Sequence, residues 1–346
     1  MRSVGPGWFA LVMATGIVST AADREGCPWI SLALLVVAVA SYAVLVVLSL
    51  ARLWRWPAQV RADLATPPTS FGFFAVVAGS AVLGEGLAEL QVGAVALTLL
   101  AVAVVGWLVL GYAVPALVVL APEKPGFAAS LDGSWLLWVV ATQAVSTAAA
   151  LTAGRDGGLR LLATVTAVTA VTTWAVGVVL YVSLLTLLLL RLLVVPVSPH
   201  QMTPPYWIVM GATAITVLAG SRILELDRTR PLVRLSTPLV EGLSLLLWSF
   251  GTWTIPLLVI FGAWRHVVRR DRLRYTPHLW AMVFPLGMYS VATAEFGRVT
   301  GLPFLAVPAR VAFWVALVAW VAVFAAMLVS LAAGSRRRMA GMRVGR

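Results

Sequence analysis

Charged residues are scarce in this chain of 346 residues. They make up 11% of the sequence, whereas soluble domains carry about 25%. Hydrophobic residues make up 61%. A water-facing surface cannot be built from so few charges, so the composition excludes soluble, disordered and collagen-like proteins. The chain is expected to use lipid as its solvent.

Cysteine and histidine are scarce as well. The one cysteine, Cys27, excludes an intramolecular disulfide and a thiolate metal cage. The three histidines, His200, His266 and His278, fall in or beside polar linkers, whereas a buried haem or zinc ion needs ligands on facing helices. We predict no metal site and no cofactor. The sequence also lacks the HExxH, P-loop and GxSxG motifs, and no enzyme is expected.

Long charge-free windows are abundant. Each is long enough, at about 20 residues, to cross a membrane once. The ten windows are residues 3–22, 26–51, 64–84, 90–122, 133–154, 161–190, 192–221, 242–264, 275–294 and 311–335. The first lacks the features of a cleaved signal peptide, and the helix of the seventh is expected to begin near Tyr206. We predict an all-α integral membrane protein with one ten-helix transmembrane domain at 1–335 and a basic tail at 336–346.

The distribution of basic residues predicts the topology. Ten crossings place both termini on one side of the membrane. That side receives 16 of the 25 Lys and Arg residues and the other receives 9, which predicts cytoplasmic termini in the plasma membrane. The arginine-rich tail and the segment 265–274 then face the cytoplasm, where we expect contacts with anionic membrane lipids and not with nucleic acid.

The odd-numbered windows begin alike, with Pro or Gly, then an aromatic residue, then small residues. The leading aromatic residues are Trp8, Phe71, Trp135, Trp207 and Trp280. Their spacings of 63, 64, 72 and 73 residues each match one pair of helices. The pattern predicts one helical hairpin used five times.

Composition separates the odd windows from the even ones. The odd windows are rich in Gly, Ala, Ser and Thr, as in 75–84 and 139–150, whereas the even ones are rich in Leu, as in 184–190. Small residues allow helices to approach closely, and their hydroxyls can face a cavity. We therefore expect the odd helices to surround a central pore and the even helices to face lipid. The candidate pore-lining residues are Thr15, Gly16, Ser80, Thr142, Ser146, Thr213 and Thr293.

A pore with few fixed charges suits an ion that must not be held tightly. The five inner helices would direct their N-termini, each with about half a positive charge, toward the cytoplasmic mouth. That field favours an anion.

Glu295 is the most deeply embedded charge, late in the ninth window, and it precedes Arg298 by three residues. One interpretation is an ion pair within the helix. The other is a proton-coupling carboxylate, because ionisable groups within membranes are often functional.

Four segments in this order resemble a known family: residues 6–17 (PGWF…MATGI), 135–143, 248–253 and 284–287 (FPLG). They are similar to the tellurite-resistance/C4-dicarboxylate transporter family, which includes the plant slow-type anion channels and fungal malate and sulfite exporters. The resemblance extends over the whole chain.

The resemblance implies five helical hairpins around a pore, a homotrimer, and a gating phenylalanine on the ninth helix. The matching residue is Phe284, followed by Pro285, and a hydrophobic constriction of this kind can stop ions by dewetting. The other aromatic candidates on inner helices are Phe9, Phe71, Phe73 and Phe74. The implied function is an anion channel or exporter for dicarboxylates, tellurite-related oxyanions, sulfite, chloride or nitrate. The alternative is a proton-coupled C4-dicarboxylate transporter that uses Glu295.

Overall fold

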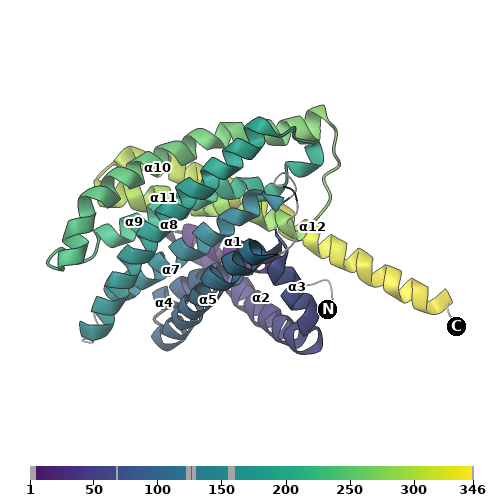
Figure 1. Cartoon of the computed structure of the whole chain (residues 1–346), viewed down its shortest axis with the longest axis horizontal. Helices are drawn as coiled ribbons and strands as arrows, with labels where there is room; N and C mark the ends of the chain where they lie inside the picture. The colour runs from purple at the N-terminus through teal and green to yellow at the C-terminus, as the bar shows by residue number, and fades with distance from the viewer. Residues whose placement is uncertain (1–4, 68, 122–125, 127–129, 155–159, 345–346) are drawn as a thin grey trace.

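The computed structural model describes residues 5–67, 69–121, 126, 130–154 and 160–344, with side chains up to residue 333. The described residues form helices and no β-strand, which confirms the predicted all-α class (Figure 1). The side chains of the basic tail at 336–346 lie outside the described part.

Two sets of helices alternate along the chain. The shorter set is α1 (Ala10–Arg24), α4 (Phe74–Glu89), α7 (Leu137–Gly154), α9 (Ile208–Leu224) and α11 (Trp280–Thr300). The longer set is α2 (Pro28–Arg55), α5 (Gly93–Leu120), α8 (Arg160–Val194), α10 (Pro231–Ala263) and α12 (Ala306–Val344). A short helix, α3 (Pro57–Ala65), follows α2.

Nine helices of the described residues are long and apolar enough to cross a membrane, where the sequence predicted ten. The first predicted window forms a 3₁₀ turn at Pro6–Phe9 followed by α1, which has 15 residues. The turn and α1 together cover Pro6–Arg24 and end in the charged residues Asp23 and Arg24. The structure thus supports a multi-pass membrane protein with nine candidate spans.

Burial separates the two sets as their compositions predicted. In the spans that contain α4, α7, α9 and α11, between 72% and 89% of the residues are buried. In the spans of the longer set, only 17% to 28% are buried. Helix α1 belongs with the buried set, since 12 of its 15 residues are buried.

The five buried helices contact one another in a closed cycle. Each packs against the next in the order α1, α4, α7, α9, α11, and α11 packs against α1. Each longer helix packs on the buried helix that precedes it in the chain, and α2, α5, α8, α10 and α12 form the periphery.

Glycine allows the buried helices to approach closely. A Cβ atom added at Gly16 of α1 would lie 2.9 Å from Cγ1 of Val82 on α4. One added at Gly211 of α9 would lie 2.7 Å from Cγ of Pro285 on α11. Both distances are shorter than a carbon–carbon contact, so any larger side chain would push the neighbouring helix away.

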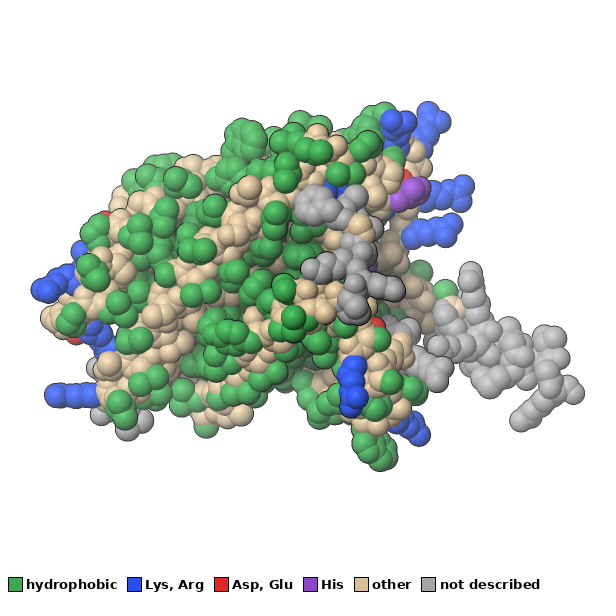
Figure 2. Space-filling model, in the orientation of Figure 1, with side chains coloured by type: hydrophobic (Ala, Val, Ile, Leu, Met, Phe, Trp, Pro, Cys, Tyr) green, Lys and Arg blue, Asp and Glu red, His purple; other side chains and the backbone are tan. Residues whose placement is uncertain are grey.

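The outer surface is apolar along its length and basic at its two ends. Figure 2 shows hydrophobic side chains covering the flank, with Lys and Arg gathered at opposite ends of the molecule. This is the distribution of a protein whose flank faces lipid and whose ends face water. Helix α3 and the C-terminal end of α12 lie at the same end (Figure 1).

Several helix boundaries differ from the charge-free windows. Helix α10 begins at Pro231, before the window that starts at residue 242, because the exposed residues Arg234 and Glu241 lie on its first turns. Helix α8 continues through Arg191, which is buried and donates a hydrogen bond of 2.7 Å to the hydroxyl of Tyr206. Helix α12 continues to Val344, through the segment predicted as a separate tail.

Candidate functional site

Each buried helix begins with a 3₁₀ turn. The turns are η1 (Pro6–Phe9), η2 (Thr69–Phe73), η3 (Gly133–Leu136), η5 (Pro204–Trp207) and η7 (Pro277–Leu279). Pro at the first or second position starts η1, η5 and η7, where the missing N–H carries no cost. The turns contact one another in the same closed cycle as the helices that follow them. The repeated Pro or Gly followed by an aromatic residue therefore marks five helix starts that meet at one end of the molecule.

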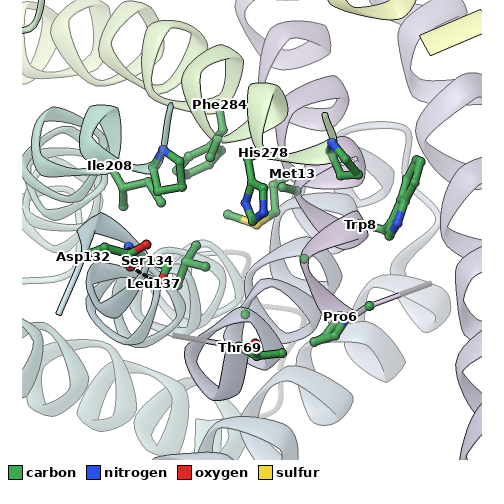
Figure 3. A pocket seen from close by; sticks show the side chains of 17 residues that line it. Pro6, Trp8, Met13, Thr69, Asp132, Ser134, Leu137, Ile208, His278 and Phe284 are labelled. Carbon is green, nitrogen blue, oxygen red and sulfur yellow. Dashed lines mark hydrogen bonds between the residues drawn. The ribbon is translucent and has the colours of Figure 1, made fainter. Parts of the chain in front are cut away.

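A cavity of about 330 Å³ lies among these five turns. Each turn, or a residue beside it, contributes to the lining of the cavity. Figure 3 shows the side chains that surround it. Its deeper wall is apolar and comes from four buried helices: Met13, Leu137, Ile208 and Phe284. The cavity is therefore bounded by the helix starts and by apolar side chains of the helices that follow them.

Asp132 is the acidic residue at this mouth. Its carboxylate accepts hydrogen bonds from the backbone N–H and the hydroxyl of Ser134, at 2.9 and 2.5 Å. It thus caps the N-terminus of η3. His278, on η7, also lines the cavity.

Phe284 lies at the floor of the cavity and is 1% exposed. It precedes Pro285, which is inside helix α11 and cannot donate a hydrogen bond to the carbonyl of Ala281. Pro285 fits against Gly211 of the neighbouring helix α9. Phe284 therefore lines the cavity beside a point where the helix ladder is interrupted, whereas Pro285 packs against α9.

The hydroxyls predicted to line the pore point instead toward the outer helices. Trp320 of α12 donates to Thr15 (3.0 Å), Trp107 of α5 to Thr142 (2.9 Å) and Trp248 of α10 to Thr293 (3.1 Å). The hydroxyls of Ser80 and Tyr42 of α2 are 2.8 Å apart, and Ser146 donates to the carbonyl of Ala170 on α8 (2.7 Å).

Thr213 and Gly16 also face neighbouring helices. The hydroxyl of Thr213 lies against Gly251 of α10, where an added Cβ would be 2.3 Å away, and Gly16 lies against α4. None of these seven residues is among those that line the cavity of the described structure.

These contacts contain a fivefold belt that sequence reasoning missed. One aromatic residue of each outer helix forms a hydrogen bond with the next buried helix along the chain. The fifth such residue is Trp174 of α8, which donates to the carbonyl of Thr216 on α9 (3.1 Å). Trp320 of the last helix bonds to the first buried helix and closes the belt. The aromatic members are Tyr42, Trp107, Trp174, Trp248 and Trp320, and the four tryptophans are the donors of their bonds. Their spacings of 65, 67, 74 and 72 residues follow those of the leading aromatic residues and could have revealed it.

Glu295 lies at the opposite end of the buried helices, and its side chain is 3% exposed. It pairs with Arg298 at 3.0 Å, as the helical interpretation predicts. It also pairs with Arg24 of α1 at 2.5 Å and with Arg222 of α9 at 3.1 Å. Glu295 is therefore the centre of an ion-pair network that joins three buried helices.

A profile of the voltage-dependent anion channels matches residues 3–328. The chain belongs to this family. Membership confirms the resemblance drawn from the four motifs, and the family consists of channels and transporters, not enzymes.

Three relatives are named as a membrane protein or as transporters. An uncharacterised membrane protein of Mycobacterium tuberculosis is 48% identical over 141 residues, which are 41% of this chain and 71% of the relative. Two uncharacterised transporters of Methanocaldococcus jannaschii match at 24% and 28% identity. These two matches cover 36% and 26% of this chain, and 34% and 24% of the respective relatives.

Proposed function

We propose that this member of the anion channel family is a channel or exporter for small anions, with Phe284 as the gate of its pore. The observation that carries the proposal is the cavity among five helix starts, which Phe284 lines. The anions would be dicarboxylates, tellurite-related oxyanions, sulfite, chloride or nitrate. The path would follow the common axis of the five buried helices.

The proposed architecture counts α1 as the tenth span. Helix α1 contacts α2, α4, α11 and α12 in the way that the other buried helices contact their neighbours. Five consecutive pairs, beginning with α1 and α2, then form five helical hairpins around the axis. We also propose a homotrimer with cytoplasmic termini in the plasma membrane, on the basis of the family resemblance and the distribution of arginine.

The preference for anions follows from the helix starts. The N-terminus of a helix carries about half a positive charge, and five such ends surround the cavity. The apolar floor supplies no cation that would hold an anion tightly, which permits rapid exit.

The gate follows from the size and position of Phe284. A benzyl group in an apolar constriction leaves too little room for a hydrated ion, and water leaves such a constriction readily. Opening requires the ring to move, and the interrupted helix ladder at Pro285 lowers the cost of a local bend.

The partners of Glu295 favour a channel over a proton-coupled dicarboxylate carrier. A coupling carboxylate exchanges its ion-pair partner for a proton in every cycle. Glu295 would have to leave three guanidinium groups on three helices to do so.

Replacing the gate residue tests the proposal. In planar bilayers, Phe284→Ala should raise the anion current by about tenfold or more, since it removes the hydrophobic barrier. The matched control is Phe313→Ala, which empties an equal volume at a fully buried site on the outer helix α12. An unchanged current in Phe284→Ala would contradict the gate, as would an equal rise in the control.

A further inference from the structure

A ring of polar side chains lies at the end of the buried helices opposite to the cavity. Each of the five helices contributes one residue, roughly three to four turns after its leading aromatic residue. The residues are Arg24, Glu85, Thr147, Arg222 and Glu295, called here the polar ring.

The members of the polar ring contact one another across helix boundaries. Glu295 of α11 pairs with Arg24 of α1 at 2.5 Å and with Arg222 of α9 at 3.1 Å. Thr147 of α7 donates a hydrogen bond of 2.5 Å to Glu85 of α4. These contacts therefore join α1, α9 and α11 in one half of the ring, and α4 and α7 in the other.

The carboxylate of Glu295 is enclosed, whereas the arginines reach the surface. The Glu295 side chain is 3% exposed, compared with 15% for Arg222 and 21% for Arg24. Arg298 and Glu225 lie outside the ring and form a further ion pair with each other. The guanidinium groups thus lie between water and the buried end of the helix bundle.

One guanidinium retains unused hydrogen-bonding capacity. Nε of Arg222 is buried and has no hydrogen-bond partner among the described residues. A buried donor without a partner is costly. Rings of Arg and Lys are also how anion pores attract their ions.

We propose that the polar ring is a second constriction of the pore and its charge filter. A passing anion contacts Arg24 and Arg222 in exchange for Glu295, the carboxylate that both arginines share, while Arg222 also pairs with Glu225 at 3.6 Å. This inference rests on the proposed function, because it places the ring on the same anion path. It assigns selectivity to the ring and opening to Phe284, at opposite ends of the buried helices.

The competing role is purely structural, in which the ion pairs only hold the helix ends together. The two roles differ in what a charge change does to an open channel. A structural pair affects how much protein folds, which changes the number of channels. A charge filter affects the ratio of anion to cation permeability, which does not depend on the number of channels.

The test uses the Phe284→Ala channel in planar bilayers with a tenfold KCl gradient. Arg222→Gln and Arg24→Gln, each added to that channel, should lower the chloride-to-potassium permeability ratio by about tenfold. Glu295→Gln should keep or raise the ratio, because it removes the carboxylate that both arginines share. Arg222→Lys should retain most of the ratio, since the charge is kept. The matched control is Arg310→Gln. Arg310 lies on the outer helix α12 and pairs with Glu25 at 2.9 Å.

The outcomes distinguish a failure of the charge-filter proposal from a failure of the proposed channel function. If Phe284→Ala conducts chloride selectively and neither arginine variant changes the permeability ratio, the filter is wrong and the proposed function stands. An equal loss of selectivity in Arg310→Gln would also overturn the filter, because general surface charge would explain it. If the Phe284→Ala protein conducts no anion, the proposed function fails, and the filter fails with it.

Discussion

At the scale of single residues, the sequence did not determine the direction in which the hydroxyl groups of the buried helices point. Thr15, Thr142 and Thr293, which were predicted to line the pore, lie on buried helices, and each accepts a bond from a tryptophan of an outer helix. A helix that is buried on every side has no polar stripe, so a period of 3.6 residues cannot show which face is directed to the axis. Phe284 was singled out by the family resemblance and lines the cavity, and its role as the gate stays a prediction.

The belt of aromatic residues predicts that removing one of its hydrogen bonds lowers the stability of the protein. Trp320→Phe keeps most of the buried ring and removes the N–H that reaches Thr15 at 3.0 Å. The loss of a buried hydrogen bond should lower the free energy of unfolding by about 1 to 3 kcal/mol. Thermal unfolding in detergent would measure it. Trp314→Phe, at a half-exposed site on the same helix, is the control. Equal melting temperatures for both variants would contradict a stabilising belt.

At the scale of elements, composition predicted burial more accurately than it predicted helix ends. Small residues in the odd windows indicated the buried set, because close helix packing requires them. The ends were harder to predict. Arg191 lies inside helix α8 because Tyr206 satisfies it, and a charge-free window stops before such a residue. Helix α3 was missed because it has only nine residues and includes the charged residues Arg61 and Asp63.

The capped start of η3 predicts an electrostatic effect on conduction. Asp132 both caps this turn and places a negative charge at the mouth of the cavity. Asp132→Asn keeps an oxygen that can accept from Ser134 and removes the charge. The anion current of the Phe284→Ala channel should rise about twofold or more when chloride enters from this end. Asp227→Asn, on an exposed loop between α9 and α10, provides the control. A current that stays the same or falls would show that the charge of Asp132 does not oppose anions.

At the scale of the whole molecule, the closed cycle of buried helices brings together residues that are distant in the chain. Arg24 and Glu295 are 271 positions apart, yet their side chains are 2.5 Å apart. The sequence predicted a pair between Glu295 and Arg298 because both lie on one helix. It could not predict the partners on α1 and α9, because ring closure depends on how all five buried helices pack.

The axis of the five buried helices is the central claim, and chemical modification within it is the most direct test. Met13→Cys, in the Phe284→Ala channel with Cys27→Ser, places a single thiol in the cavity wall. N-ethylmaleimide at this thiol should reduce the anion current to about a tenth or less, because the adduct fills the narrowing passage. The same reagent at Thr229→Cys, an exposed site outside the cavity, should leave the current unchanged. Complete modification of Met13→Cys with an undiminished current would show that anions do not follow this axis.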